Sequence, residues 1–143
     1  MAFPDRIERT VELAHPVDTV WVALTTSDAL AAWFGEAATI DPRPGGAGEM
    51  TFASGQSVQM RVERVEEPCV FGFTWRIPEL PYDDPRRNYV EFTLEPTGAG
   101  TRLRVVETGF AQLPDDTRRG AYDSHAEGWA VELGDLAGYL DAA

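Results

Sequence analysis

The sequence predicts an α+β fold in which a curved antiparallel sheet of six or seven strands surrounds a long C-terminal helix. The first observation is a central series of short segments with alternating apolar and polar residues, joined by tight turns. The second is a C-terminal stretch whose apolar residues recur at three- and four-residue steps. A sheet that wraps around one helix is an economical way to bury such an apolar stripe.

The N-terminal part is predicted to form one strand followed by two short helices. Residues 6–14 alternate between apolar and polar side chains, which is typical of a half-buried strand. Pro16 is suited to the first turn of a helix, and apolar residues follow it at helical spacing. Ser27 or Asp28 is expected to cap a second short helix, which Gly35 would end.

The middle of the chain is predicted to supply most of the sheet. Residues 42–48 are rich in proline and glycine, and no Gly-Lys-Ser/Thr sequence follows them, so we interpret them as a hairpin turn and not as a phosphate-binding loop. Residues 77–88 contain three prolines and are expected to form a long loop. Strands are expected where apolar residues alternate, around residues 50–52, 58–62, 71–75, 90–94 and 103–105.

The last segment is predicted to be a helix of about twenty residues, roughly 30 Å long. Pro114 followed by Asp115 and Asp116 marks the beginning of the helical region, because proline and acidic residues favour a first helical turn. Gly120 is expected to mark the true start of the helix, and Gly128 a close approach to the sheet. The apolar stripe consists of Tyr122, Ala126, Trp129, Leu133, Leu136 and Leu140.

The composition is that of a globular domain, and we expect one domain over residues 1–143. The 24 acidic and 12 basic residues give a formal net charge of −12. This charge argues against binding to nucleic acid or to anionic membranes, since both require a basic patch. The lone Cys69 excludes an internal disulfide and is expected to be buried. Neither a signal pattern nor a membrane-spanning apolar run is present, so we expect a cytoplasmic protein.

Several short strings, in order along nearly the whole chain, resemble one known family. They are AHPVDTVW (14–21), AWFG (32–35), PRPGG (42–46), EPCVFGFTW (67–75), VEFTLEP (90–96), GTRL (100–103), GF (109–110) and GW (128–129). The set is similar to the bacterial AHSA1-like proteins, relatives of the activator of Hsp90 ATPase, within the START-like or Bet v 1-like (SRPBCC) superfamily. The resemblance implies a helix-grip fold, which often encloses an apolar cavity between sheet and long helix.

No arrangement of residues in the sequence is diagnostic of catalysis, so we expect no catalytic residue, no cofactor and no metal. The two histidines are far apart in sequence and the chain has one cysteine, which disfavours a zinc site. His15 is expected to be exposed at a strand–helix junction. His125 lies one helical turn before Trp129, and it is either a structural residue or a ligand-binding or acid–base group.

The aromatic residues are the candidates for a ligand site, with plain core packing as the alternative for each of them. Trp33 and Phe34 are expected to gate an entrance, and His125 and Trp129 to face it from the helix. Apolar walls with few polar groups are typical of small-molecule sites. The expected walls are Phe52, Met60, Phe73, Trp75 and Phe92, and the polar groups that could orient a ligand include Tyr122, Thr74, Arg76 and Tyr89.

The leading functional hypothesis is the binding of an apolar or aromatic small molecule between the sheet and the C-terminal helix. The alternatives are a polyketide cyclase-like or hydrolase-like enzyme that uses His125 with a tyrosine, or a self-resistance protein. A co-chaperone or other protein-partner module is a further alternative, suggested by the Hsp90-activator resemblance. Exposed strand edges and the proline-rich loop leave a homodimer open.

Overall fold

A computed structural model describes residues 5–142 and contains one seven-stranded antiparallel sheet with three α-helices and a 3-10 helix. The predicted α+β class is therefore confirmed. The strands are β1 (Arg6–Leu13), β2 (Ala37–Ile40), β3 (Ala47–Thr51), β4 (Ser57–Glu66), β5 (Val70–Arg76), β6 (Arg87–Thr97) and β7 (Gly100–Thr108). The helices are α1 (Val17–Thr25), α2 (Ser27–Trp33), the 3-10 helix η1 (Phe110–Gln112) and α3 (Asp115–Ala142).

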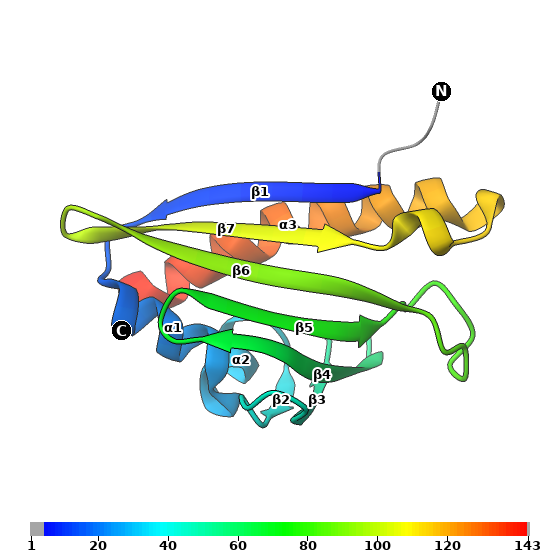
Figure 1. Ribbon diagram of the computed structural model, residues 1–143, viewed down its shortest axis with the longest axis horizontal. Helices are drawn as coiled ribbons and strands as arrows, with labels where there is room; N and C mark the ends of the chain where they lie inside the picture. The colour runs from blue at the N-terminus through cyan, green and yellow to red at the C-terminus, as the bar shows by residue number, and fades with distance from the viewer. Residues whose placement is uncertain (1–4, 143) are drawn as a thin grey trace.

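The strand order explains how the two short helices fit the fold. The sheet runs β1-β7-β6-β5-β4-β3-β2, so the first two strands of the chain form its opposite edges. Helices α1 and α2 connect these edges, and they lie at one end of the sheet (Figure 1). The remaining strands follow one another through hairpins, which is the arrangement that the alternating segments and tight turns predicted.

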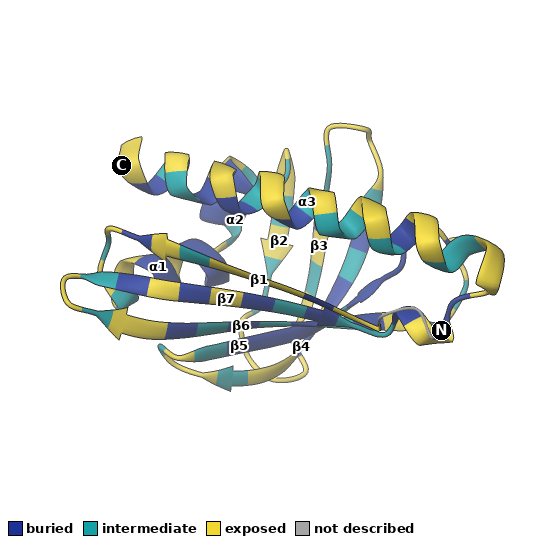
Figure 2. Cartoon of the chain, turned by 90° about the horizontal axis from the view of Figure 1, so that it is seen from above, coloured by how far each residue is buried: buried dark blue, intermediate teal, exposed yellow. Residues whose placement is uncertain are grey.

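Helix α3 lies along one face of the sheet and turns its buried side toward it (Figure 2). The predicted stripe is confirmed, because Trp129, Leu133, Leu136 and Leu140 are buried. The predicted start at Gly120 is wrong, since the helix begins at Asp115 and contains 28 residues. Two aspartates in the first turn favour this earlier start, because they complement the positive end of the helix.

The side chains between the sheet and the helices form one hydrophobic core. Alternate residues of the strands point into it, as the period-two patterns predicted. Trp21 of α1 contacts Phe71 of β5 edge to face, with ring centroids 5.9 Å apart. The largest fully buried side chains include Phe71, Phe73, Phe92, Phe110, Leu24, Met50, Leu103 and Leu136.

The structure corrects two local expectations and adds one strand. The side chain of Ser27 does not cap α2, because its hydroxyl instead accepts a hydrogen bond from the backbone N–H of Ile40 at 3.0 Å. Strand β2 was not predicted, because it is only four residues long and its side chains are exposed or half-buried. Cys69 is exposed, because it lies in the turn between β4 and β5, where its N–H donates to the carbonyl of Glu66.

Two further findings concern the surroundings of His15 and the apolar character of the helices. His15 is half-buried, and its Nε2 lies 2.8 Å from the exposed carboxylate of Asp141, so it ties the end of β1 to the end of α3. Among residues 5–142, no helix combines the length and the apolar character that crossing a membrane would need.

Candidate functional site

A buried carboxylate, Glu107 on β7, lies at the centre of the candidate site. It is 0% exposed and follows Leu103 and Val105 on the inward-facing side of the strand. A buried charge is costly unless its oxygens are fully hydrogen-bonded. The neighbours of Glu107 must therefore supply donors.

Four side chains donate hydrogen bonds to Glu107. The sheet supplies the amide of Asn88 at 2.9 Å from the neighbouring strand β6 and the indole N–H of Trp75 at 3.0 Å from β5, the next strand beyond it. Helix α3 supplies Nδ1 of His125 and the indole N–H of Trp129, each at 2.9 Å. The last two are four residues apart, so they lie on one face of the helix. The carboxylate thus fastens α3 to the sheet.

His125 is held between two carboxylates. Its Nδ1 faces Glu107, and its Nε2 lies 2.9 Å from Glu79 in the loop between β5 and β6. Burial disfavours the charged imidazolium, but the hydrogen bonds and charges of the two glutamates outweigh it and raise the pKa of His125 to about 10. Burial also opposes the charge on Glu107, but the bonds from His125, Asn88 and Trp129 hold its pKa below the ordinary value. Both groups are therefore ionised near neutral pH.

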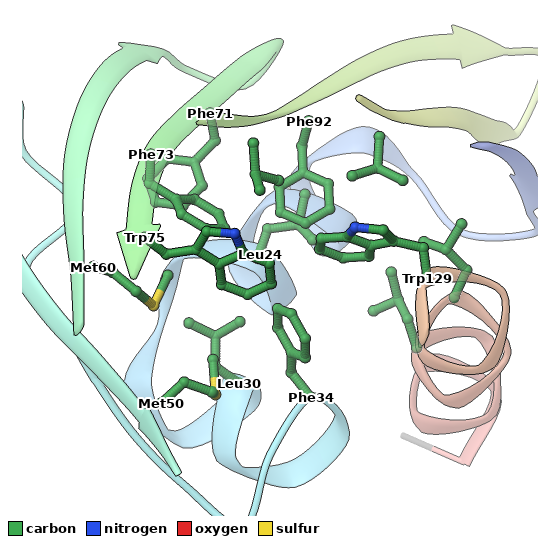
Figure 3. Close-up of a cluster of buried hydrophobic side chains, with 14 of the residues drawn as sticks. Leu24, Leu30, Phe34, Met50, Met60, Phe71, Phe73, Trp75, Phe92 and Trp129 are labelled. Carbon is green, nitrogen blue, oxygen red and sulfur yellow. The ribbon is translucent and has the colours of Figure 1, made fainter. Parts of the chain in front are cut away.

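A cavity of about 240 Å³ opens beside this network, between the sheet, the end of α2 and α3. Phe34 follows α2 and contacts Trp129 and Trp75, with ring centroids 5.4 and 6.0 Å apart. Figure 3 shows these three rings pointing toward one another from α2, the sheet and α3. The lining residues are Phe34, Phe52, Gln56, Val58, Trp75, Pro78, Glu79, Ser124, His125, Gly128, Trp129 and Glu132.

Helix α3 contributes a glycine, Gly128, and a carboxyl group, that of Glu132, to the cavity wall. A Cβ at Gly128 would meet no atom within 4 Å, so the predicted close approach of Gly128 to the sheet is wrong. One turn further on, Glu132 lines the cavity, and its buried Oε2 has no hydrogen-bond partner within residues 5–142. Burial and the nearby charge of Asp135 raise the pKa of Glu132 to about 7.

The family model for Activator of Hsp90 ATPase homolog 1-like proteins matches residues 14–141, which is most of the chain. The chain belongs to the AHSA1-like family. The predicted resemblance is thereby confirmed, together with the helix-grip arrangement of sheet and long helix. No curated protein matches the sequence of this AHSA1-like chain.

Solved structures agree with this membership. MLL2253 from Mesorhizobium loti is 28% identical, with a TM-score of 0.83 over 96% of this chain and 98% of that chain. CV1439 from Chromobacterium violaceum is 26% identical, with a TM-score of 0.72 over 96% and 98%. DynU16, a protein of the dynemicin biosynthetic locus, is 24% identical with a TM-score of 0.79, and the match covers 96% of this chain but 48% of DynU16. At that identity, DynU16 shows the fold alone.

The ten ligand-binding residues proposed from the AHSA1-like sequence divide into two groups. Those that line the cavity are Phe34, Phe52, Trp75, His125 and Trp129. Those that do not line it are Trp33, Met60, Phe73, Phe92 and Tyr122. Trp33 donates its N–H to the carbonyl of Ala23 at 2.8 Å, and Tyr122 donates its hydroxyl to the carbonyl of Arg6 at 3.0 Å. Phe73 and Phe92 are buried in the core, where they pack against each other.

Three polar side chains suggested as ligand-orienting groups also lie outside the cavity. Thr74 donates to Glu63 at 2.8 Å, and Tyr89 donates to Glu91 at 2.9 Å. Arg76 is buried, and its guanidinium donates to backbone carbonyls while stacking on the ring of Tyr82. Each of the three is already engaged by protein groups.

Sequence reasoning missed the four polar residues that organise the site, Glu79, Asn88, Glu107 and Glu132. The alternation of side chains along the strands did indicate two of them, Glu107 and Asn88. Glu107 is in phase with Leu103 and Val105, and Asn88 is in phase with Val90 and Phe92, so both alternations place a polar side chain on the buried face. A polar residue in phase with the core is expensive and points to a buried network.

Proposed function

We propose that the protein binds a small apolar or aromatic molecule in the cavity between the sheet and α3. The observation that carries this proposal is the composition of the cavity wall. The rings of Phe34, Phe52, Trp75 and Trp129 form its apolar part, and the polar residues between them are Gln56, Glu79, Ser124, His125 and Glu132. Such a wall is typical of small-molecule sites.

The geometry of the two indoles favours a stable binding wall. Trp75 and Trp129 stack with ring centroids 5.7 Å apart and planes 24° apart. Each donates its N–H to Glu107, so neither ring can rotate without losing a buried hydrogen bond. A wall that is already ordered loses little conformational entropy when a ligand binds.

The size of the cavity limits the ligand to about one or two aromatic rings. Its volume is about 240 Å³. A dry apolar cavity of about 150 Å³ holds benzene, whereas sites for drug-sized molecules measure about 300–1,000 Å³. A large polycyclic compound would have to displace side chains or remain partly in solvent.

The contacts of His125 favour binding over proton transfer by this residue. With a pKa of about 10, the imidazole is protonated near neutral pH, and both of its N–H groups donate to carboxylates. A general base needs a free lone pair near the operating pH. We therefore assign His125 to holding the site together.

Titration with 2-naphthalenemethanol, a neutral two-ring probe, tests the proposal. The protein should bind the probe saturably and melt at a higher temperature as probe concentration rises. Gly128→Leu places a side chain in the cavity wall and should lower the affinity at least tenfold. Gly134→Leu, on the exposed side of the same helix, is the matched control and should retain the affinity of the parent. Absence of binding, or an equal loss in both variants, would refute the proposal.

A further inference from the structure

The cavity wall is acidic, and among residues 5–142 no free cation lines it. The ionisable residues that line the cavity are Glu79, His125 and Glu132, and the positive charge of His125 already faces Glu79 and Glu107. An adjoining groove shares Phe34, Phe52 and Glu132 with the cavity and adds Glu36 and Asp135. None of the described arginines lines either hollow.

Glu132 differs from the other acidic residues of the site because it has a buried oxygen to which no group among residues 5–142 donates. Glu107 accepts from four side chains, and Glu79 contacts His125. Oε2 of Glu132 is buried, and no hydrogen bond reaches it from residues 5–142. A buried acceptor without a donor is unfavourable, so a ligand that supplies a donor there gains more than the same contact would give in water.

We infer that the ligand of this cavity is an aromatic amine whose ammonium group donates to Glu132 while its rings lie among Phe34, Trp75 and Trp129. The inference rests on the proposed function and names the chemical class that the same site selects. A charge-assisted hydrogen bond to a carboxylate is about twice as strong as one between neutral groups. The net charge of −12 also attracts a cation toward the entrance.

The protonation of Glu132 provides a second, independent readout. The ligand-free carboxyl has a pKa of about 7, because of burial first and the charge of Asp135 second. Besides Asp135, the ionisable residues that line the same two hollows as Glu132 are Glu79 and His125 in the cavity and Glu36 in the groove. Since an ammonium ion prefers the ionised carboxylate, amine affinity should rise between about pH 6 and pH 8.

The experiment compares two probes of the same shape, 2-naphthylmethylamine and 2-naphthalenemethanol, by calorimetric titration at about pH 8. The amine should bind at least tenfold more tightly than the alcohol. Glu132→Gln should remove that preference and leave alcohol binding within about threefold of the parent. Glu127→Gln removes the same charge from an exposed position on α3, outside the cavity, and should retain the preference.

Each outcome separates this inference from the proposed function. If both probes bind equally, or if the two glutamine variants weaken the amine equally, the specific role of Glu132 is wrong while the aromatic cavity stands. If neither probe binds, the proposed function is wrong and the inference falls with it. An amine preference that is as large at about pH 6, where Glu132 is mostly protonated, as at about pH 8 would also overturn the inference.

Discussion

Glu107 keeps a negative charge in the protein interior because four donors, one of them the cationic His125, surround its two oxygens. Its donors come from β5, β6 and α3, so one side chain joins elements that are distant in sequence. Three of these donors, Trp75, His125 and Trp129, also line the cavity. We therefore expect the stability of the fold and the shape of the cavity to depend on one carboxylate.

Glu107→Gln is expected to destabilise the protein by about 3–5 kcal/mol, the usual cost of removing one partner from a buried ion pair. The glutamine amide would turn an N–H₂ group toward donors and leave His125 with Glu79 as its single carboxylate partner. Denaturant unfolding measures the change. Glu95→Gln, at an exposed position of β6, should stay within about 0.5 kcal/mol of the parent. A similarly small effect at Glu107 would contradict the role assigned to its charge.

The charge of His125 should make the stability of the protein fall at alkaline pH. Its pKa is 6.5 in an ordinary environment and about 10 in the folded protein. The stabilisation is complete below about pH 6.5 and disappears as the pH approaches about 10, because only the folded state holds the proton across that interval. The free energy of unfolding should therefore decrease by up to about 1.4 kcal/mol per pH unit.

His125→Gln should remove this slope while keeping an N–H donor near Glu107. The measurement is a series of denaturant melts between about pH 7.5 and 9.5, a window above the pKa of Glu132 and below that of Tyr89. Glu132 contributes a slope of the same sign between its ordinary value of 4.5 and about 7, so lower pH values are left out. An unchanged slope in the variant would show that another group carries it.

Helix α3 illustrates how far an element could be predicted from the sequence. The spacing of Trp129, Leu133, Leu136 and Leu140 predicted the buried stripe correctly. The helix contains four glycines, and a Cβ would meet nothing within 4 Å at any of them. Packing of the stripe stabilises the helix through these positions, and this tertiary contribution is absent from local propensity.

Replacing Gly134 and Gly138 by alanine should stabilise the protein by about 1–2 kcal/mol in total, since glycine costs about 0.5–1 kcal/mol at each helical position. Both residues are exposed. Thermal unfolding measures the gain. The same substitution at Gly109 should have the opposite sign, because its φ is 118° and a Cβ would lie 2.4 Å from Oδ1 of Asn88. Destabilisation by the helical pair would contradict the regular helix described for α3.

The architecture of the whole molecule was predictable because it depends on the order of local patterns. Alternating segments, tight turns and one long amphipathic stretch suffice to specify a sheet around a helix. The site was less predictable, because it depends on contacts between segments far apart in the chain. Trp75 and Trp129 share Glu107 only after β5, β7 and α3 have packed together.

The most direct test of an aromatic ligand site is a two-dimensional NMR titration of the indole N–H signals with 2-naphthalenemethanol. The chain has four tryptophans, so each indole can be assigned by a single Trp→Phe variant. We expect saturable shifts at Trp75 and Trp129, which line the cavity, and no shift at Trp21, which packs in the core against Phe71. Unchanged signals at Trp75 and Trp129, or equal shifts at Trp21, would contradict the proposed binding site.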